Sequence, residues 1–156
     1  MTTTFTSPAP DSYQALIDAL LATPATTGAT VIGLSGPLGA GKTTFTQALA
    51  RALGVTTTVR SPTFTIMQRY ELDHPKFDQL YHIDAYRLED PKELEPLGIS
   101  ELWHQVRTLV VIEWPERIAT ALPPQTHCCR FSIINDEIRE IVLQDVSGCR
   151  SDSSAT

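Results

Sequence analysis

Apolar positions recur along the first third of the chain at intervals that predict a helix, a strand and a second helix. Residues 12–22 carry apolar side chains three and four positions apart, which is typical of an amphipathic helix. TVIGL at 30–34 is a short apolar run and predicts a strand buried on both faces. A second helix is predicted over 43–53, and Gly54 stands where a helix usually stops.

The middle of the chain alternates apolar and polar residues, as strands with one buried face do. Residues 64–72 and 80–86 show this alternation on the two sides of a turn, and together they predict a hairpin. A helix is predicted to begin at Asp90, because the proline that follows suits a first helical turn, and to stop at Gly98. A second short helix is predicted over 100–106.

The last third of the chain returns to strands. TLVVIE at 108–113 is rich in β-branched residues and predicts another buried strand. A helix is predicted from Pro115 to a point before Pro123, and a final strand pair over 129–134 and 140–146. Strands interleaved with helices indicate a three-layer α/β domain with a central mixed sheet flanked by helices.

The length of 156 residues suits one domain, which we assign to residues 1–146. The segment 147–156 is rich in serine and is expected to be a disordered tail, and the Thr- and Pro-rich residues 1–10 form a second soft end. The chain has 12 basic and 18 acidic side chains, a formal net charge of −6. Such a chain is not expected to bind DNA or RNA by itself, because phosphate binding needs clustered cations.

No segment indicates secretion or a membrane anchor. The first ten residues lack the basic and apolar regions of a signal peptide, and the uncharged stretch 19–41 has too much glycine, threonine and proline to span a membrane. We therefore expect a cytoplasmic protein with reduced thiols at its three cysteines. The four histidines show no metal-ligand spacing, so no zinc site is expected.

The strongest chemical signal is GPLGAGKT at 36–43, which matches the pattern G-x-x-x-x-G-K-[ST] between a predicted strand and a predicted helix. Glycines let the backbone wrap around a polyphosphate with its N–H groups turned inward, and the helix N-terminus adds positive potential. Lys42 is expected to contact the terminal phosphates, and the hydroxyl of Thr43 to ligate Mg²⁺. The pattern predicts a nucleotide phosphate site.

Two acids and one hydroxyl-bearing segment could complete such a site. Glu113 ends a buried strand, where it is either a solvated acid or, beside a P-loop, the carboxylate that P-loop proteins often use to hold Mg²⁺. Asp84 either orders an attacking water near the metal or pairs with Arg87 at a strand end. Thr63, in SPTF at 61–64, belongs either to a switch segment that contacts Mg²⁺ or phosphate or to an ordinary turn before a strand.

Five segments occur in an order that one known family shares: GPLGAGKTTFTQALARALG (36–54), SPTF (61–64), HIDAYRL (82–88), LGI (97–99) and VVIEWPERI (110–118). In this order they resemble the TsaE family (older name YjeE), the bacterial P-loop ATPases of threonylcarbamoyladenosine synthesis on tRNA. The resemblance covers the chain from about residue 12 to residue 135. It is more specific than the P-loop alone, because few P-loop families are this short and end a strand in Glu-Trp.

The resemblance implies that the three-layer α/β domain is a small domain of the P-loop NTPase type, which binds and hydrolyses ATP with Mg²⁺. It also implies action with two protein partners, TsaB and TsaD, with tRNA reached only through that complex. By the same resemblance Asp84 and Lys42 would be catalytic, and Thr43 and Glu113 would hold the metal. The nucleotide would be bound by Gly39, Ala40, Gly41, Lys42, Thr43, Thr44, Ser12 and Thr63.

Three other functions use a P-loop and stand as alternatives. A small-molecule kinase would share the loop and the size, but we find no Arg-rich lid after residue 115. A GTP-driven switch would need a base-reading N-K-x-D segment, which this sequence lacks. A scaffold would bind nucleotide only to stabilise a complex, without hydrolysing it.

Overall fold

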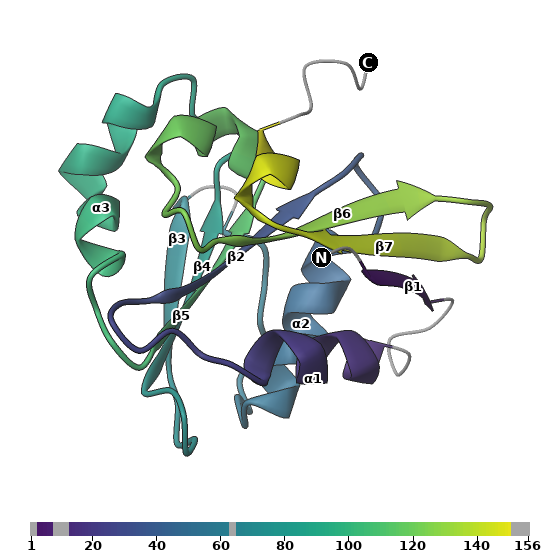
Figure 1. Ribbon diagram of the computed structural model, residues 1–156, viewed down its shortest axis with the longest axis horizontal. Coiled ribbons are helices and arrows are strands. Elements are labelled where there is room, and N and C mark those ends of the chain that lie inside the picture. Colours follow the sequence, from purple (N-terminus) through teal and green to yellow (C-terminus); the bar gives the residue numbers. More distant parts are fainter. Residues whose placement is uncertain (1–2, 8–12, 63–64, 151–156) are drawn as a thin grey trace.

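The computed structural model describes residues 3–7, 13–62 and 65–150, which form a seven-stranded sheet with helices on both faces (Figure 1). The strands are β1 (Thr3–Ser7), β2 (Thr30–Ser35), β3 (Met67–Glu71), β4 (Gln79–Asp84), β5 (Thr108–Glu113), β6 (His127–Ile133) and β7 (Arg139–Gln144). The helices are α1 (Gln14–Leu21), α2 (Lys42–Ala52) and α3 (Ile99–Leu102), with 3-10 helices η2 (Pro91–Leu97), η3 (Pro115–Ala121) and η4 (Val146–Cys149).

The sheet is mixed, with a parallel centre and an antiparallel hairpin at each side. Its strand order is β1-β7-β6-β2-β5-β4-β3. The four central strands β6, β2, β5 and β4 run parallel, whereas β3 pairs antiparallel with β4, and β7 pairs antiparallel with both β6 and β1. The hairpin predicted from the alternating segments is therefore confirmed as β3 and β4.

Each face of the sheet carries its own hydrophobic core. Ile32 and Leu34 of β2 pack with α1 and α2 on one face, while Val31 packs with η2, α3 and η3 on the other. This division follows from the strand period of two, which sends successive side chains to opposite faces. The arrangement confirms the prediction of a three-layer α/β fold with a central mixed sheet.

The N-terminal segment contains a strand where a soft end was expected. Residues Thr3–Ser7 form the edge strand β1, which pairs with β7 from Thr3 against Leu143 to Ser7 against Arg139. The segment is mainly threonine, a residue with high strand propensity, and a strand ladder is held by main-chain hydrogen bonds. A soft end was expected because the segment can bury little apolar surface, and for residues 3–7 that expectation was wrong.

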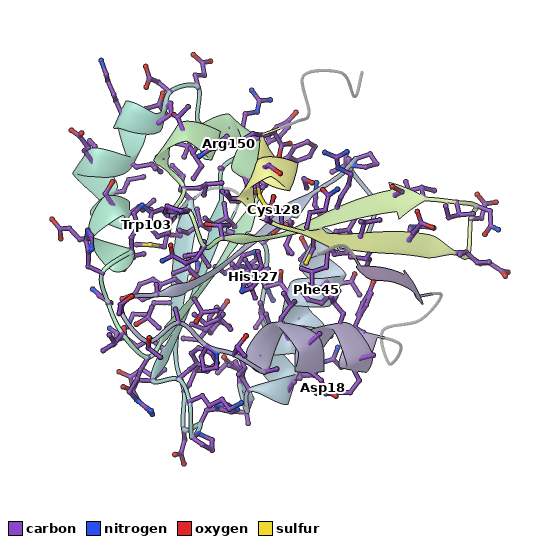
Figure 2. The ribbon with its side chains drawn as sticks, in the orientation of Figure 1. Asp18, Phe45, Trp103, His127, Cys128 and Arg150 are labelled. Atoms are coloured by element: carbon purple, nitrogen blue, oxygen red, sulfur yellow. A yellow bond between two sulfur atoms is a disulfide. The ribbon has the colours of Figure 1, made fainter. Side chains whose placement is uncertain are left out.

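Two of the three cysteines are joined, so the expectation of reduced thiols is wrong for this pair. Cys128 of β6 and Cys149 of η4 form a disulfide (Figure 2). Cys129, the sequence neighbour of Cys128, is a free and buried thiol. The two neighbours differ because Cys128 lies in the core that contains Cys149, and Cys129 lies in the opposite core with α1 and α2.

The predicted disordered tail from residue 147 is also wrong as far as residue 150. The helix η4 buries Gly148 and Cys149, and its N-cap Asp145 accepts a hydrogen bond from the Ser147 backbone N–H. The helix lies against β2, because a Cβ built on Gly33 would be only 2.7 Å from Sγ of Cys149. Residues 151–156 lie outside the described part of the chain.

The predicted helices around the prolines exist but are 3-10 rather than α-helical. Asp90 caps η2, which contains Pro96 and ends at Gly98 as expected. In η3, which begins at Pro115, Ile118 has non-helical backbone angles. No helix among the described residues is long and apolar enough to cross a membrane.

Candidate active site

The carboxyl ends of three parallel strands bring the predicted site residues together. In the sheet register, Glu113 at the end of β5 lies beside Leu34 of β2 on one side and beside Asp84 of β4 on the other. Side chains two positions apart along a strand lie on the same face of the sheet. Both acids therefore project from the face of the sheet that packs against α2. Ligands of open α/β sheets commonly bind at such strand ends.

The loop between β2 and α2 has the backbone shape that its glycines predict. Gly36, Gly39 and Gly41 have φ angles of 139°, 82° and 102°, a region that side chains other than glycine rarely adopt. Gly36 also passes close to β6, since a Cβ built there would lie 2.5 Å from the carbonyl oxygen of Phe131. The loop leads into α2, whose first turn offers unbonded backbone N–H groups to an anion.

Lys42 begins α2 and is buried, with its side chain turned back along the loop. Its Nζ donates a hydrogen bond to the carbonyl oxygen of Gly36 and lies 3.5 Å from the ring centroid of Trp114. Burial lowers the pKa of Lys42, and the negative charge of Glu113 opposes that shift. The amine is thus held above the loop by one backbone oxygen and one aromatic face.

Thr43, Glu113 and His82 form a chain of contacts from α2 across the sheet. The Thr43 hydroxyl donates to Oε1 of Glu113 at 2.9 Å, and Nε2 of His82 lies 2.6 Å from Oε2 of the same acid. His82 is fully buried. Sequence reasoning gave His82 no role in the site. The signal was present in the alternation of 80–86, which places His82 and Asp84 on one side of the strand.

Asp84 lies beside this chain and is held by two donors. The Ser61 hydroxyl donates to Oδ2 at 3.3 Å, and the backbone N–H of Tyr86 donates to Oδ1 at 3.0 Å. The interaction with Ser61 brings the segment before β3 to the cavity, and a switch role for that segment stays a prediction. Thr63 itself lies outside the described residues, as does Ser12.

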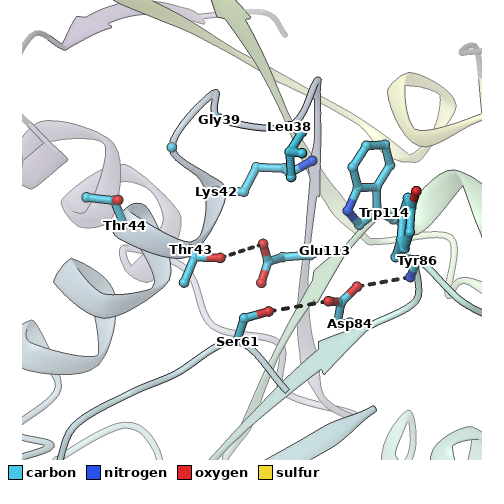
Figure 3. Close-up of a pocket in the computed structure, with 11 residues that line it drawn as sticks. Leu38, Gly39, Lys42, Thr43, Thr44, Ser61, Asp84, Tyr86, Glu113 and Trp114 are labelled. Carbon is cyan, nitrogen blue, oxygen red and sulfur yellow. Dashed lines mark hydrogen bonds between the residues drawn. The ribbon is translucent and has the colours of Figure 1, made fainter. Parts of the chain in front are cut away.

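These side chains surround one cavity of about 460 Å³ (Figure 3). Seven predicted residues line it: Gly39, Gly41, Lys42, Thr43, Thr44, Asp84 and Glu113. Four others complete the lining: Leu38, Ser61, Tyr86 and Trp114. Ala40 is the exception among the described candidates, because its side chain is buried in the core with α1 and α2 and its backbone N–H donates to Pro37.

The donor atoms suit a magnesium ion. Thr43 Oγ1 and Glu113 Oε1 are 2.9 Å apart, about the separation of neighbouring ligands around octahedral Mg²⁺ with bonds near 2.1 Å. No group of three or more His, Cys, Asp or Glu among the described residues could hold a metal ion. Mg²⁺ is usually held by one or two protein oxygens together with substrate phosphates, so this small donor set fits it.

Comparisons with known proteins identify the family of the chain. A sequence model of the family described as threonylcarbamoyl adenosine biosynthesis protein TsaE matches residues 8–141. The TsaE protein of Bacillus subtilis is 41% identical over 116 residues, which cover 74% of this chain and 70% of the relative. The TsaE protein of Treponema pallidum is 38% identical over 113 residues, covering 72% of this chain and 80% of the relative.

A solved structure has the same fold. The crystal structure of Bacillus subtilis YdiB superposes with a TM-score of 0.72 at 33% sequence identity, covering 94% of this chain and 86% of that chain. The family match spans most of the sequence, including the phosphate loop and both acids. The chain therefore belongs to the TsaE family of threonylcarbamoyl adenosine biosynthesis proteins.

Proposed function

We propose that this protein binds and hydrolyses ATP with Mg²⁺ and couples that hydrolysis to turnover of a TsaB–TsaD complex. That complex would install threonylcarbamoyl on adenosine of tRNA in the cytoplasm. The acidic chain, with a net charge of −6, would reach tRNA through its partners rather than directly. Family membership and the geometry of the cavity are the two supports for this proposal.

One observation carries the proposal. Lys42 and Thr43 at the start of α2 face Glu113 and Asp84 at two strand ends, and all four line a single cavity. A cation, a hydroxyl and two carboxylates beside a helix N-terminus are the parts that phosphoryl transfer to water requires. They come from three separate segments of the chain, so their convergence depends on the fold.

Each residue then has a role that its contacts support. The backbone N–H groups at the start of α2 would bind the phosphates, and Lys42 would exchange its bond to the Gly36 carbonyl for one to a terminal phosphate oxygen. Thr43 and Glu113 would hold Mg²⁺, which neutralises charge developing on the phosphates. Asp84 would accept a hydrogen bond from the attacking water and orient it.

The proposal is tested by measuring ATP turnover with and without the partners. We expect slow release of phosphate by the purified protein and faster release when TsaB and TsaD are added. Lys42→Ala should lower the stimulated rate by at least about 100-fold, the usual cost of removing one charge-stabilising donor. Fast turnover alone, with no gain from the partners, would contradict the coupling.

The same assay separates hydrolysis from the two nearest alternatives. Release of ADP and inorganic phosphate in equal amounts indicates transfer to water, whereas ADP without phosphate indicates a kinase with another acceptor. Glu113→Ala should abolish phosphate release. If tRNA modification in the reconstituted system continues undiminished with that variant, the protein acts as a nucleotide-binding scaffold instead.

A further inference from the structure

A buried histidine contacts the acid that we assign to the metal. His82 projects from β4 with none of its side chain exposed, and its Nε2 lies 2.6 Å from Oε2 of Glu113. Glu113 is itself 5% exposed at its side chain. The pair is therefore shielded from water. In such a buried environment a hydrogen bond is stronger, and a misplaced polar group is more costly, than at the surface.

The two oxygens of Glu113 have different partners. Oε1 faces α2 and accepts the hydroxyl hydrogen bond of Thr43, while Oε2 faces the sheet and meets His82. The bond to Thr43 joins the two proposed magnesium ligands, so it has to give way when both oxygens turn to a metal. The bond to His82 lies on the far side of the carboxylate and is free to persist.

The imidazole is arranged to donate rather than to accept. A carboxyl group that holds a metal ion is ionised, and its oxygens then only accept hydrogen bonds. With Glu113 in that state, the contact uses a proton on Nε2 of His82. Nδ1 is buried with no hydrogen-bond partner among the described residues, so a proton on Nδ1 would have no acceptor there. An apolar side chain would fill this position without an unsatisfied buried nitrogen, so packing alone does not account for a histidine here.

We propose that His82 is a positioning residue for magnesium: its Nε2–H fixes Oε2 of Glu113 and thereby aims Oε1 at the place shared with the Thr43 hydroxyl. This inference rests on the proposed function, because it assumes that Glu113 holds the metal. Partners of metal-ligating side chains commonly change metal affinity 10- to 100-fold when they are removed. His82 would contact neither nucleotide nor metal and would act only through Glu113.

The test compares two amide substitutions that differ in where they place the donor. His82→Gln puts an N–H near the position of Nε2, whereas His82→Asn is too short to reach Glu113. Calorimetry measures the ATP Kd with Mg²⁺ and with a chelator, and the ratio of the two is the metal-dependent tightening. His127→Asn is the matched control, because His127 is a partly buried histidine on β6 of the same sheet and does not line the cavity.

We expect His82→Asn to reduce the metal-dependent tightening at least about tenfold, with ATP binding in the chelator unchanged. His82→Gln and His127→Asn should stay within about threefold of the unaltered protein. Equal loss in the Asn and Gln variants, or no loss in either, overturns the inference. Should His82→Asn not fold, His82→Leu, which is close to histidine in volume, takes its place.

Two further measurements separate positioning from a general structural effect. In a Glu113→Gln background, His82→Asn should have little additional effect on the tightening ratio, since the two residues act as one unit. Nitrogen-15 NMR of the unaltered protein should find the His82 proton on Nε2, and a proton on Nδ1 would overturn the inference. If the unaltered protein shows no Mg²⁺-dependent binding of ATP at all, the proposed function itself fails.

Discussion

Replacing Gly36 by alanine tests whether the shape of the phosphate loop depends on its first glycine. Gly36 has a φ of 139°, and an added Cβ would lie 2.5 Å from the carbonyl oxygen and 2.9 Å from the Cβ of Phe131. Even weak C–H···O contacts keep carbon and oxygen about 3.3 Å apart, so the loop or β6 would have to move by nearly 1 Å. Because the Gly36 carbonyl accepts the hydrogen bond of Lys42, such a movement also displaces the amine.

The expected cost has two parts. A side chain held at positive φ costs about 1–2 kcal/mol, and forcing extra volume into a packed contact costs about 1–3 kcal/mol more. Gly36→Ala should therefore lower the free energy of unfolding by about 2–5 kcal/mol. Gly54→Ala is the matched control: Gly54 has a φ of 91° but nothing within 4 Å of an added Cβ, so only the first part applies.

Urea denaturation and ATP titration of both variants give the comparison. We expect Gly36→Ala to be less stable than Gly54→Ala by about 1–3 kcal/mol, a difference of roughly 2–4 °C in Tm for each kcal/mol. Gly36→Ala should also bind ATP more weakly, whereas Gly54→Ala should match the unaltered protein. Equal stability of the two variants, or unimpaired ATP binding by Gly36→Ala, would refute the reasoning.

Three more predictions concern the second acid and the cysteines. Asp84→Asn should slow phosphate release about 100-fold or more while the ATP Kd stays within about threefold, because Asp84 orients water rather than binds nucleotide. A loss of ATP affinity that parallels the loss of phosphate release would count against that role. Reducing the disulfide between Cys128 and Cys149, 21 residues apart, should lower the free energy of unfolding by about 3 kcal/mol, measured in urea with and without reductant. The Cys149→Ser variant should not respond to the reductant. Burial raises the pKa of the Cys129 thiol from 9.0 to about 12, so above pH 9 the unfolded chain releases a proton that the folded protein keeps. The free energy of unfolding should therefore fall by about 1.4 kcal/mol per pH unit between pH 9 and about pH 12. The Cys129→Ala variant should not show this contribution to the pH dependence.

The phosphate loop was predictable because its requirements are local. The glycines, Lys42 and Thr43 follow one another in the sequence, and both the strand before them and the helix after them have clear periods. Glu113 could be proposed as a site residue because it ends a buried strand, where P-loop proteins often place an acid. For Asp84 the residues alone left two roles open, and only the family resemblance favoured the site. Their contacts with Thr43 and Ser61 could not be assigned, since these depend on how α2 and the segment before β3 pack.

The features that sequence reasoning missed depend on pairing between distant segments. His82 meets Glu113 only because β4 and β5 are neighbours in a register that places His82 opposite Val111, two residues before Glu113. Cys128 meets Cys149 because η4 returns to the face of β6 away from α2. The strand β1 has no apolar periodicity of its own and forms against a partner at the other end of the chain. Neither composition nor local spacing contains that information.

The carboxyl ends of β2, β5 and β4 are joined by main-chain hydrogen bonds beyond their last paired residues. Ala85 N–H donates to the carbonyl of Glu113 at 3.0 Å, and Trp114 N–H donates to the carbonyl of Leu34 at 3.2 Å. One wall of the cavity is consequently hydrogen-bonded backbone, which holds the main chain of Asp84 and Glu113 in place. We expect any closure around a nucleotide to come from parts of the lining that lie outside the sheet, such as the loop of 36–41 and Ser61.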